Sequence, residues 1–254
     1  VSLRYELKGS GDDTLILIHE LGGSLESWDE VLPELQKHFR VLRYDQRGFG
    51  LSEKTDSITM EGIIADLACL LEAIGITSPC HIAGTALGAG IAIGFATSHP
   101  NRVKRLAVAS PSTRGSSKTV AAREERIKKI KLGGMRSSVD KSLDKSYPNI
   151  LRTNTERFER YRNRWLSNDP ESFIAINHFL TTLDVTAGLG SIGCPTLVVG
   201  CEYDTIRTPE MSRQVAKKIP SSTYIEAPTG HFMAVQTPDL FIKIILPFLL
   251  GKTS

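Results

Sequence analysis

Short apolar runs rich in β-branched residues recur along this chain and alternate with segments of helical periodicity. Residues 14–19 form one such run and end in a glycine-rich turn, as a buried parallel strand does. In residues 60–74 the apolar side chains recur three and four positions apart, which is typical of a helix that buries one face. The pattern predicts strands at 3–7, 14–19, 40–45, 80–83, 103–109, 195–200 and 223–226. It predicts helices at 30–37, 60–74, 86–98, 209–219 and 238–250.

Alternating strands and helices predict an α/β protein with a mostly parallel, twisted sheet and helices on both faces. Residues 111–184 interrupt this rhythm, because they are polar, basic and helical in character. Since the segment stands between two strands, we predict a helical cap over the carboxyl ends of the strands, where open α/β sheets bind ligands. The predicted division is a core of residues 1–111 and 185–254 and a cap of residues 112–184.

The composition is that of an ordinary globular domain, with 41% hydrophobic and 23% charged residues among 254. No apolar run reaches the ~18 residues that a membrane span needs, and we expect no membrane partner and no signal segment. The four cysteines lie in apolar runs without metal-ligand spacing, which favours buried free thiols, no metal site and a cytoplasmic location. The net charge of +3 gives no indication of nucleic acid as a partner.

The charge is unevenly distributed along the chain. Residues 118–164 carry fourteen Lys or Arg and six Asp or Glu. For most of these residues we favour solvated helix faces. The alternative is an attractive field for an anionic small substrate.

One five-residue segment carries the strongest chemical signal in the chain. Gly84-Thr-Ala-Leu-Gly88 directly follows a predicted strand and opens a predicted helix, which is the context of the G-x-S-x-G nucleophile elbow. In that motif a strained turn exposes the central residue, and the glycines let strand and helix approach closely. The next backbone N–H, here that of Leu87, faces the substrate oxygen. The central residue here is Ala86, whose methyl group has no lone pair and cannot attack a carbonyl.

Two side chains after the last two predicted strands complete a Ser-His-Asp type of arrangement. Asp204 stands where an acid can orient an imidazole, and Glu202 is the alternative acid. His231 stands where it can act as general base. The order nucleophile, acid, base is the one that elbow enzymes use. The backbone N–H of Leu21, which follows the second predicted strand, is the expected second oxyanion donor.

These segments together resemble the α/β-hydrolase superfamily over nearly the full length of the chain. The matching segments are His19 with Gly22-Gly23, Asp45 to Ser52, Gly84 to Gly88, Asp204 and His231. Within the superfamily the chain is most similar to the 3-oxoadipate enol-lactonase-like group, through residues 42–48, 175–184 and 192–199. The resemblance implies the α/β-hydrolase fold, with the cap inserted after the sixth strand, and a serine nucleophile at position 86. The chain departs from the family at Ala86 and at Glu20, where the family usually has glycine.

Ala86 allows two interpretations. It either replaces a serine in a chain otherwise equipped for catalysis, or it is the native residue of a protein that has lost the reaction. The retained Asp204, His231 and elbow glycines favour the first, because a protein without the reaction has no chemical reason to keep them. We therefore interpret position 86 as the site of an inactivating Ser-to-Ala change.

Three further residues are candidate substrate-binding groups. Glu20 either supports its loop or stands at the lip of the oxyanion site, where it would select a donor group on the substrate or tune His231. A carboxylate there would repel an anion, which conflicts with the basic cap. Trp165 and His178 lie in the predicted cap, and Trp165 forms either a pocket wall or part of the core of the cap.

The sequence thus predicts a cofactor-free hydrolase of a small ester, lactone or amide, and the basic cap leaves an anionic substrate as one possibility. A serine at position 86 would attack while His231 takes its proton and Asp204 holds the imidazole. No nucleotide-binding glycine motif and no cluster of metal ligands is present in the sequence. Two other classes stay open: a natural ligand-binding protein, and a non-hydrolytic enzyme of lyase or oxygenase type that works through His231. We expect a monomer or a homodimer.

Overall fold

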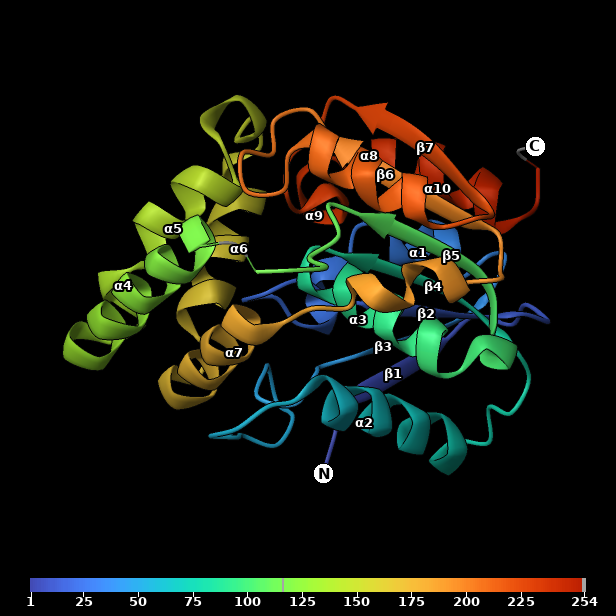
Figure 1. The fold of residues 1–254 in the computed structure, drawn as a ribbon, viewed down its shortest axis with the longest axis horizontal. Helices are drawn as coiled ribbons and strands as arrows, with labels where there is room; N and C mark the ends of the chain where they lie inside the picture. Colours follow the sequence, from blue (N-terminus) through green and yellow to red (C-terminus); the bar gives the residue numbers. More distant parts are fainter. Residues whose placement is uncertain (116, 253–254) are drawn as a thin grey trace.

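The computed structural model describes residues 1–115 and 117–252, which form one seven-stranded sheet surrounded by helices (Figure 1). The strands are β1 (Tyr5–Lys8), β2 (Thr14–Ile18), β3 (Arg40–Tyr44), β4 (Cys80–Thr85), β5 (Val103–Ala109), β6 (Thr196–Cys201) and β7 (Ser222–Ala227). Their order across the sheet is β1-β3-β2-β4-β5-β6-β7, and β1 alone runs antiparallel to its neighbour. The predicted mostly parallel sheet is therefore confirmed.

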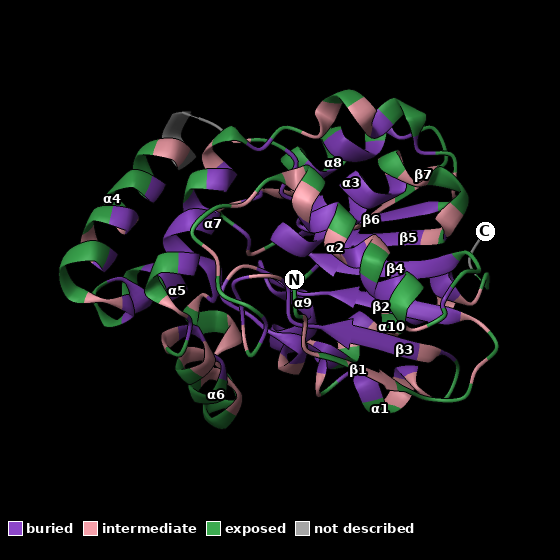
Figure 2. Cartoon of the chain, turned by 90° about the horizontal axis from the view of Figure 1, so that it is seen from below, coloured by how far each residue is buried: buried purple, intermediate pink, exposed green. Residues whose placement is uncertain are grey.

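Helices cover both faces of the sheet, and each face has its own hydrophobic core (Figure 1). One face carries α2 (Met60–Ala73), α3 (Leu87–Ser98) and α8 (Pro209–Lys218). The other face carries α1 (Leu32–Leu35) and α10 (Pro238–Leu249), with the short α9 (Met233–Gln236) before α10. Because β2 and β4 lie between these two layers, every residue of both strands is buried (Figure 2).

Four helices between β5 and β6 form a layer beside the carboxyl ends of the strands (Figure 1). They are α4 (Ser117–Gly133), α5 (Val139–Ser146), α6 (Thr155–Leu166) and α7 (Pro170–Thr182). At the base of this layer the outgoing and returning chains lie side by side, since Arg114 and Asp184 form an isolated antiparallel bridge. We call residues 112–184 the cap, as in the prediction.

The cap follows the fifth strand of the chain and not the sixth, which corrects one detail of the expected fold. The described residues before Tyr5 form no strand, so the sheet begins at the antiparallel strand β1. One strand fewer therefore precedes the cap than the resemblance implied. The carboxyl edge of the sheet is unaffected, because the parallel strands β2 to β7 all reach it.

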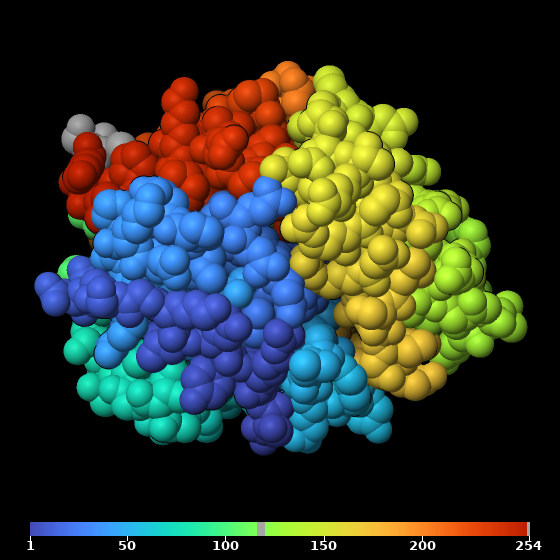
Figure 3. Space-filling model, turned by 180° about the vertical axis from the view of Figure 1, so that it is seen from behind, coloured from blue at the N-terminus to red at the C-terminus, as the bar shows by residue number. Residues whose placement is uncertain are grey.

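An ion pair joins the cap to the core. Nε of Arg157, in α6, donates to Oε1 of Glu30 across 2.8 Å. Seen from behind, the yellow segment of the cap lies against the blue segment of the core (Figure 3). The contact fixes α6 over the loop that follows β2.

Three expectations from composition can be compared with the structure directly. Over the described ranges, no helix is long and apolar enough to cross a membrane. The same residues contain no group of three His, Cys, Asp or Glu side chains that could hold a metal ion. Cys80 and Cys201 are buried free thiols, as expected. Cys194 is only partly buried, and Cys69 is exposed because it lies on the outer face of α2.

Candidate active site

Ala86 occupies a strained turn between β4 and α3. Its backbone has φ 54° and ψ −111°, in the left-handed half of the φ range that residues with a Cβ atom rarely adopt. The turn brings two backbones into contact. A Cβ atom on Gly84 would lie 2.5 Å from the carbonyl oxygen of Gly88, and one on Gly88 would lie 2.0 Å from the carbonyl oxygen of Ile18. These distances leave no room for a side chain at either position, which explains why both residues are glycine.

Asp204 and His231 form a buried hydrogen-bonded pair. Nδ1 of His231 donates to Oδ2 of Asp204 across 2.6 Å. Oδ1 of Asp204 accepts the backbone N–H groups of Ile206 and Arg207, at 2.8 and 2.9 Å. Burial works to raise the pKa of Asp204, but the charge and hydrogen bond of His231, together with the Arg207 N–H, outweigh it and hold that pKa below its usual value.

The ionised Asp204 fixes the tautomer of His231. A carboxylate only accepts hydrogen bonds, so the proton of the neutral imidazole must sit on Nδ1. Nε2 then carries the lone pair, and it has no hydrogen-bond partner among the described residues. A general base needs such a free nitrogen beside the nucleophile.

A cavity of about 300 Å³ separates the carboxyl edge of the sheet from the cap. Ala86 and His231 line it, together with Leu21 and Leu87. Trp165, from α6, lines it from the cap side. The structure therefore brings these five residues, which were predicted from separate segments of the sequence, around one cavity. The volume of the cavity lies at the small end of the range for ligand pockets.

The backbone N–H groups of Leu21 and Leu87 are available beside this cavity. Leu87 is the first residue of α3, so its N–H has no acceptor within the helix. Neither N–H donates a hydrogen bond to any part of the chain that the structure describes. Two unpaired donors, one of them at the N-terminus of α3 and the other in the loop after β2, suit a developing oxyanion.

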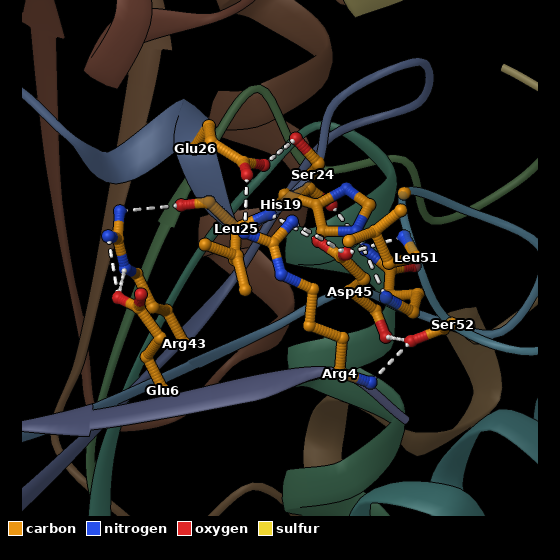
Figure 4. A network of polar contacts seen from close by, with 12 residues as sticks. Arg4, Glu6, His19, Ser24, Leu25, Glu26, Arg43, Asp45, Leu51 and Ser52 are labelled. Atoms are coloured by element: carbon orange, nitrogen blue, oxygen red, sulfur yellow. Dashed lines mark hydrogen bonds and ion pairs between the residues drawn. The ribbon is translucent and has the colours of Figure 1, made fainter. Parts of the chain in front are cut away.

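Asp45, at the end of β3, holds the loop that carries Leu21 (Figure 4). Oδ1 of Asp45 accepts the N–H of Leu25 at 2.7 Å, and Oδ2 accepts the N–H of Leu51 at 2.9 Å. Arg4 donates to the same Oδ2 at 3.3 Å. One buried carboxylate therefore ties together the loops after β2 and β3.

His19 secures the same loop in its neutral form. Its Nε2 accepts the N–H of Gln46 at 3.1 Å, so its proton sits on Nδ1 and is donated to the carbonyl oxygen of Glu20 at 2.8 Å. Burial lowers the pKa of His19, although the negative charges of Glu20 and Asp45 oppose this. We therefore assign His19 a structural role.

Replacement of Asp45 by alanine is expected to lower the free energy of unfolding by about 3 kcal/mol, because two backbone donors lose their acceptor. Urea denaturation monitored by circular dichroism measures this change. Asp56→Ala is the control, since Asp56 is exposed and lies near the same loop. It should change stability by less than about 0.5 kcal/mol. Equal stability of the two variants would contradict the role given to Asp45.

Glu20 supports the loop instead of lining the cavity. Its side chain is buried, and its Oε1 accepts the hydroxyl of Ser27 at 2.8 Å. A Cβ atom on Gly23 would lie 2.2 Å from the same oxygen, so the carboxylate fills the space that this glycine leaves. The placement of Glu20 at the lip of the site is thereby corrected, and its expected conflict with an anionic substrate disappears.

His178 is also misplaced by the prediction. It is exposed on α7, whereas Leu180, two residues later, lines the cavity. Residues two positions apart on a helix point about 200° away from one another, so His178 faces solvent. Trp165, the third candidate, does line the cavity, and its ring also packs over Gly22 of the oxyanion loop.

The basic character of the cap was predicted from the sequence, but the individual cationic side chains that line the cavity were not. Arg123 and Arg126 of α4 both line it. They share one helix face with Ile127 and Ile130, which are buried. The spacing i, i+3, i+4, i+7 places all four on the inner side of α4. Arginines at helix positions that face the core could have predicted these cavity-lining cations from the sequence.

Comparison with known proteins identifies the family of this chain. A family model described as alpha/beta hydrolase fold matches residues 13–238. Pyrrolizixenacetamide deacetylase from Xenorhabdus hominickii is 25% identical over 280 residues, covering 99% of this chain and 95% of the deacetylase. Two solved structures, a thermophilic esterase from Thermogutta terrifontis with malate bound and the enol-lactonase from Burkholderia xenovorans LB400, are each 26% identical with TM-scores of 0.91. The matches cover 99% and 98% of this chain and 94% and 96% of the esterase and lactonase chains. This chain belongs to the α/β-hydrolase family.

Proposed function

We propose that the catalytic form of this protein carries serine at position 86 and hydrolyses a small ester, lactone or amide. The observation that carries the proposal is the His231–Asp204 pair, whose free Nε2 opens onto the same cavity as the strained Ala86. A strained turn costs about 1–3 kcal/mol. An alanine gains nothing from this strained position beside the cavity, whereas a serine hydroxyl there becomes a nucleophile.

The proposed mechanism has an acylation step and a deacylation step. The serine Oγ attacks the substrate carbonyl carbon while Nε2 of His231 takes its proton. Asp204 stabilises the imidazolium, and the N–H groups of Leu21 and Leu87 bind the oxyanion. His231 then gives the proton to the leaving oxygen or nitrogen, which leaves an acyl-enzyme. Water, deprotonated by the same Nε2, attacks the acyl carbon and releases the acid and the serine.

Similar proteins support the substrate range. Those compared above are named as an esterase, an enol-lactonase and a deacetylase. Ester, lactone and amide hydrolysis all pass through a tetrahedral oxyanion, so one arrangement of nucleophile, base and N–H donors serves all three. The substrate class is therefore set by the cavity lining and not by the elbow.

Ala86→Ser is expected to raise the rate of p-nitrophenyl acetate hydrolysis by at least about 10³-fold over the chain as it stands. The same comparison on a panel of lactones and amides ranks the substrate classes. Ala122→Ser is the matched control, because it adds a hydroxyl to the same cavity from α4, away from the elbow. This control should gain no activity.

Two other outcomes would each favour a different function. Ala86 itself favours a ligand-binding protein that uses the cavity without chemistry, and absence of turnover in both the original chain and the Ala86→Ser protein would support it. Equal turnover by both would assign the chemistry to His231 without a nucleophile, as in a lyase or oxygenase-type reaction. Either result would overturn the hydrolase proposal.

A further inference from the structure

Cationic side chains gather at and near the cavity, most of them from the cap. Arg123 and Arg126 reach it from α4, and Lys145 reaches it from α5. Arg207 stands directly after Thr205 and Ile206, which also line the cavity. Arg123 is 8% exposed and Arg207 is 2% exposed, so two of these cations are almost fully withdrawn from solvent.

The buried guanidinium groups have donors without acceptors. Among the residues that the structure describes, Nη1 of Arg123 has no hydrogen-bond partner, and neither do Nε and Nη2 of Arg207. Nη1 of Arg126 donates to Oδ1 of Asn177 across 3.1 Å, which orients the group without neutralising it. A buried cation with unpaired donors is costly, so proteins keep one mainly where an anion pairs with it.

Negative charge is missing from the cavity wall. None of the described residues that line it is Asp or Glu. Burial, followed by the positive charges of Arg207 and Arg126, lowers the pKa of Arg123 to about 10. Burial also lowers the pKa of Arg207, against the attraction of Asp204. These like charges repel one another, and an anion placed among them would relieve the repulsion.

We propose that Arg123 and Arg126, with Arg207 adding positive charge behind them, bind an anionic group of the substrate while its scissile carbonyl lies against Ala86 and His231. The group is a carboxylate or a phosphate, both of which match the fork of N–H donors that a guanidinium presents. This inference rests on the proposed function and narrows it, because it selects small esters, lactones or amides that carry a negative charge away from the reacting carbonyl.

A neighbouring hollow between α4 and α5 supplies an approach for such a substrate. It shares Arg126 and Lys145 with the cavity and adds Lys129 and Lys141. The one carboxylate among its described lining residues, Glu125, forms ion pairs with those two lysines. Arg126 and Lys145 form no ion pair with a described residue, so positive charge extends from the surface into the cavity and would attract anions.

The test uses the chain with Ala86, because it lacks the hydroxyl that the proposed hydrolysis needs. Matched probes are the half methyl esters of malonic, succinic and glutaric acid, each compared with its neutral dimethyl ester by isothermal titration calorimetry at low salt. We expect at least one half ester to bind at least about tenfold more tightly than its dimethyl counterpart. Equal affinity within every pair, or no binding of any half ester, would overturn the proposal.

Arg123→Gln then tests the residue assignment. It should weaken half-ester binding by at least about tenfold and affect the dimethyl ester much less. Arg123→Lys should recover part of the affinity, because it restores the charge without the fork. Lys128→Gln is the control, since Lys128 is an exposed lysine on the same helix. Charge-selective binding that survives Arg123→Gln would contradict the assignment.

Thermal denaturation separates a binding role from a structural one. Removal of an unpaired buried cation should leave the Tm of Arg123→Gln unchanged or raise it, whereas loss of a structural contact would lower it. Competition identifies the anion. If inorganic phosphate displaces the half ester at a lower concentration than acetate does, the site prefers a phosphate. If acetate displaces it at the lower concentration, the site prefers a carboxylate. Either order supports an anion site.

The two proposals fail in different experiments. Hydrolysis of neutral p-nitrophenyl acetate by the Ala86→Ser protein does not require the arginines, so it tests the hydrolase proposal alone. Turnover without charge-selective binding would leave the hydrolase and remove the anion site. Charge-selective binding without turnover would leave the anion site in a ligand-binding protein.

Discussion

Asp204→Asn is expected to lower kcat of the Ala86→Ser protein by about 10⁴-fold and to leave its fold intact. Oδ1 of Asp204 accepts two backbone N–H groups, from Ile206 and Arg207, so the oxygen of the new amide must stay on that side. The amide NH2 then faces Nδ1 of His231. Because an NH2 group only donates, Nδ1 has to accept, and the imidazole proton moves to Nε2. His231 in that tautomer cannot take the proton of a serine.

Glu202→Gln is the matched control, since Glu202 is the other acid on the same loop and is exposed. It should change kcat by less than about twofold, as expected for an exposed surface position. Circular dichroism and Tm show whether both variants keep the fold. A large loss of kcat for Glu202→Gln with little loss for Asp204→Asn would reverse the assignment of the acid.

The fold was predictable because the strongest sequence signals coincide with full burial. All residues of β2 and β4 are buried between two helical layers, so their sequences had to be continuous apolar runs. The N-terminal strand was less well placed: residues 3–7 were predicted and Tyr5–Lys8 is observed. As an edge strand with exposed ends it carries a weaker pattern, and strand ends are the least determined part of such predictions.

The grouping of the candidate catalytic residues was predictable for a different reason. Its residues stand at the ends of parallel strands, so chain order and strand ends alone bring position 86, Asp204 and His231 to one edge. Glu20 and His178 depended on the direction of a side chain, which chain order does not specify. Glu20 turns toward Ser27, and His178 lies on the solvent side of α7.

The arginines of α4 show where charge counting fails. Residues 118–164 are rich in Lys and Arg, and most of these side chains were interpreted as solvated. That holds for Lys128, which is exposed, but Arg123 is buried five residues earlier on the same helix. The position of each residue around the helix, relative to Ile127 and Ile130, distinguishes Arg123 from Lys128. A side chain on the same face as these buried isoleucines points away from solvent.

Gly88→Ala is expected to lower the free energy of unfolding by at least about 3 kcal/mol, the upper end of the cost of overpacking a core. A Cβ atom there would lie 2.0 Å from the carbonyl oxygen of Ile18 and 2.5 Å from that of His19. Both atoms belong to the backbone, which cannot move aside without displacing β2. Alanine in place of glycine inside a helix gains only about 1 kcal/mol from propensity, so the clash dominates.

Gly193→Ala isolates the clash from the chemical change, because a Cβ atom on Gly193 would meet nothing within 4 Å. Its stability should stay the same or rise by about 0.4–1 kcal/mol, since alanine restricts the unfolded chain. Urea denaturation of both variants gives the comparison, with loss of soluble protein as the extreme result for Gly88→Ala. The same close contact at Gly88 sets the distance between α3 and β2, and so helps to bring Leu21 and Leu87 to the same cavity. Equal stability of the two variants would mean that α3 and β2 are not in contact, and the proposed oxyanion site would then lack its geometric basis.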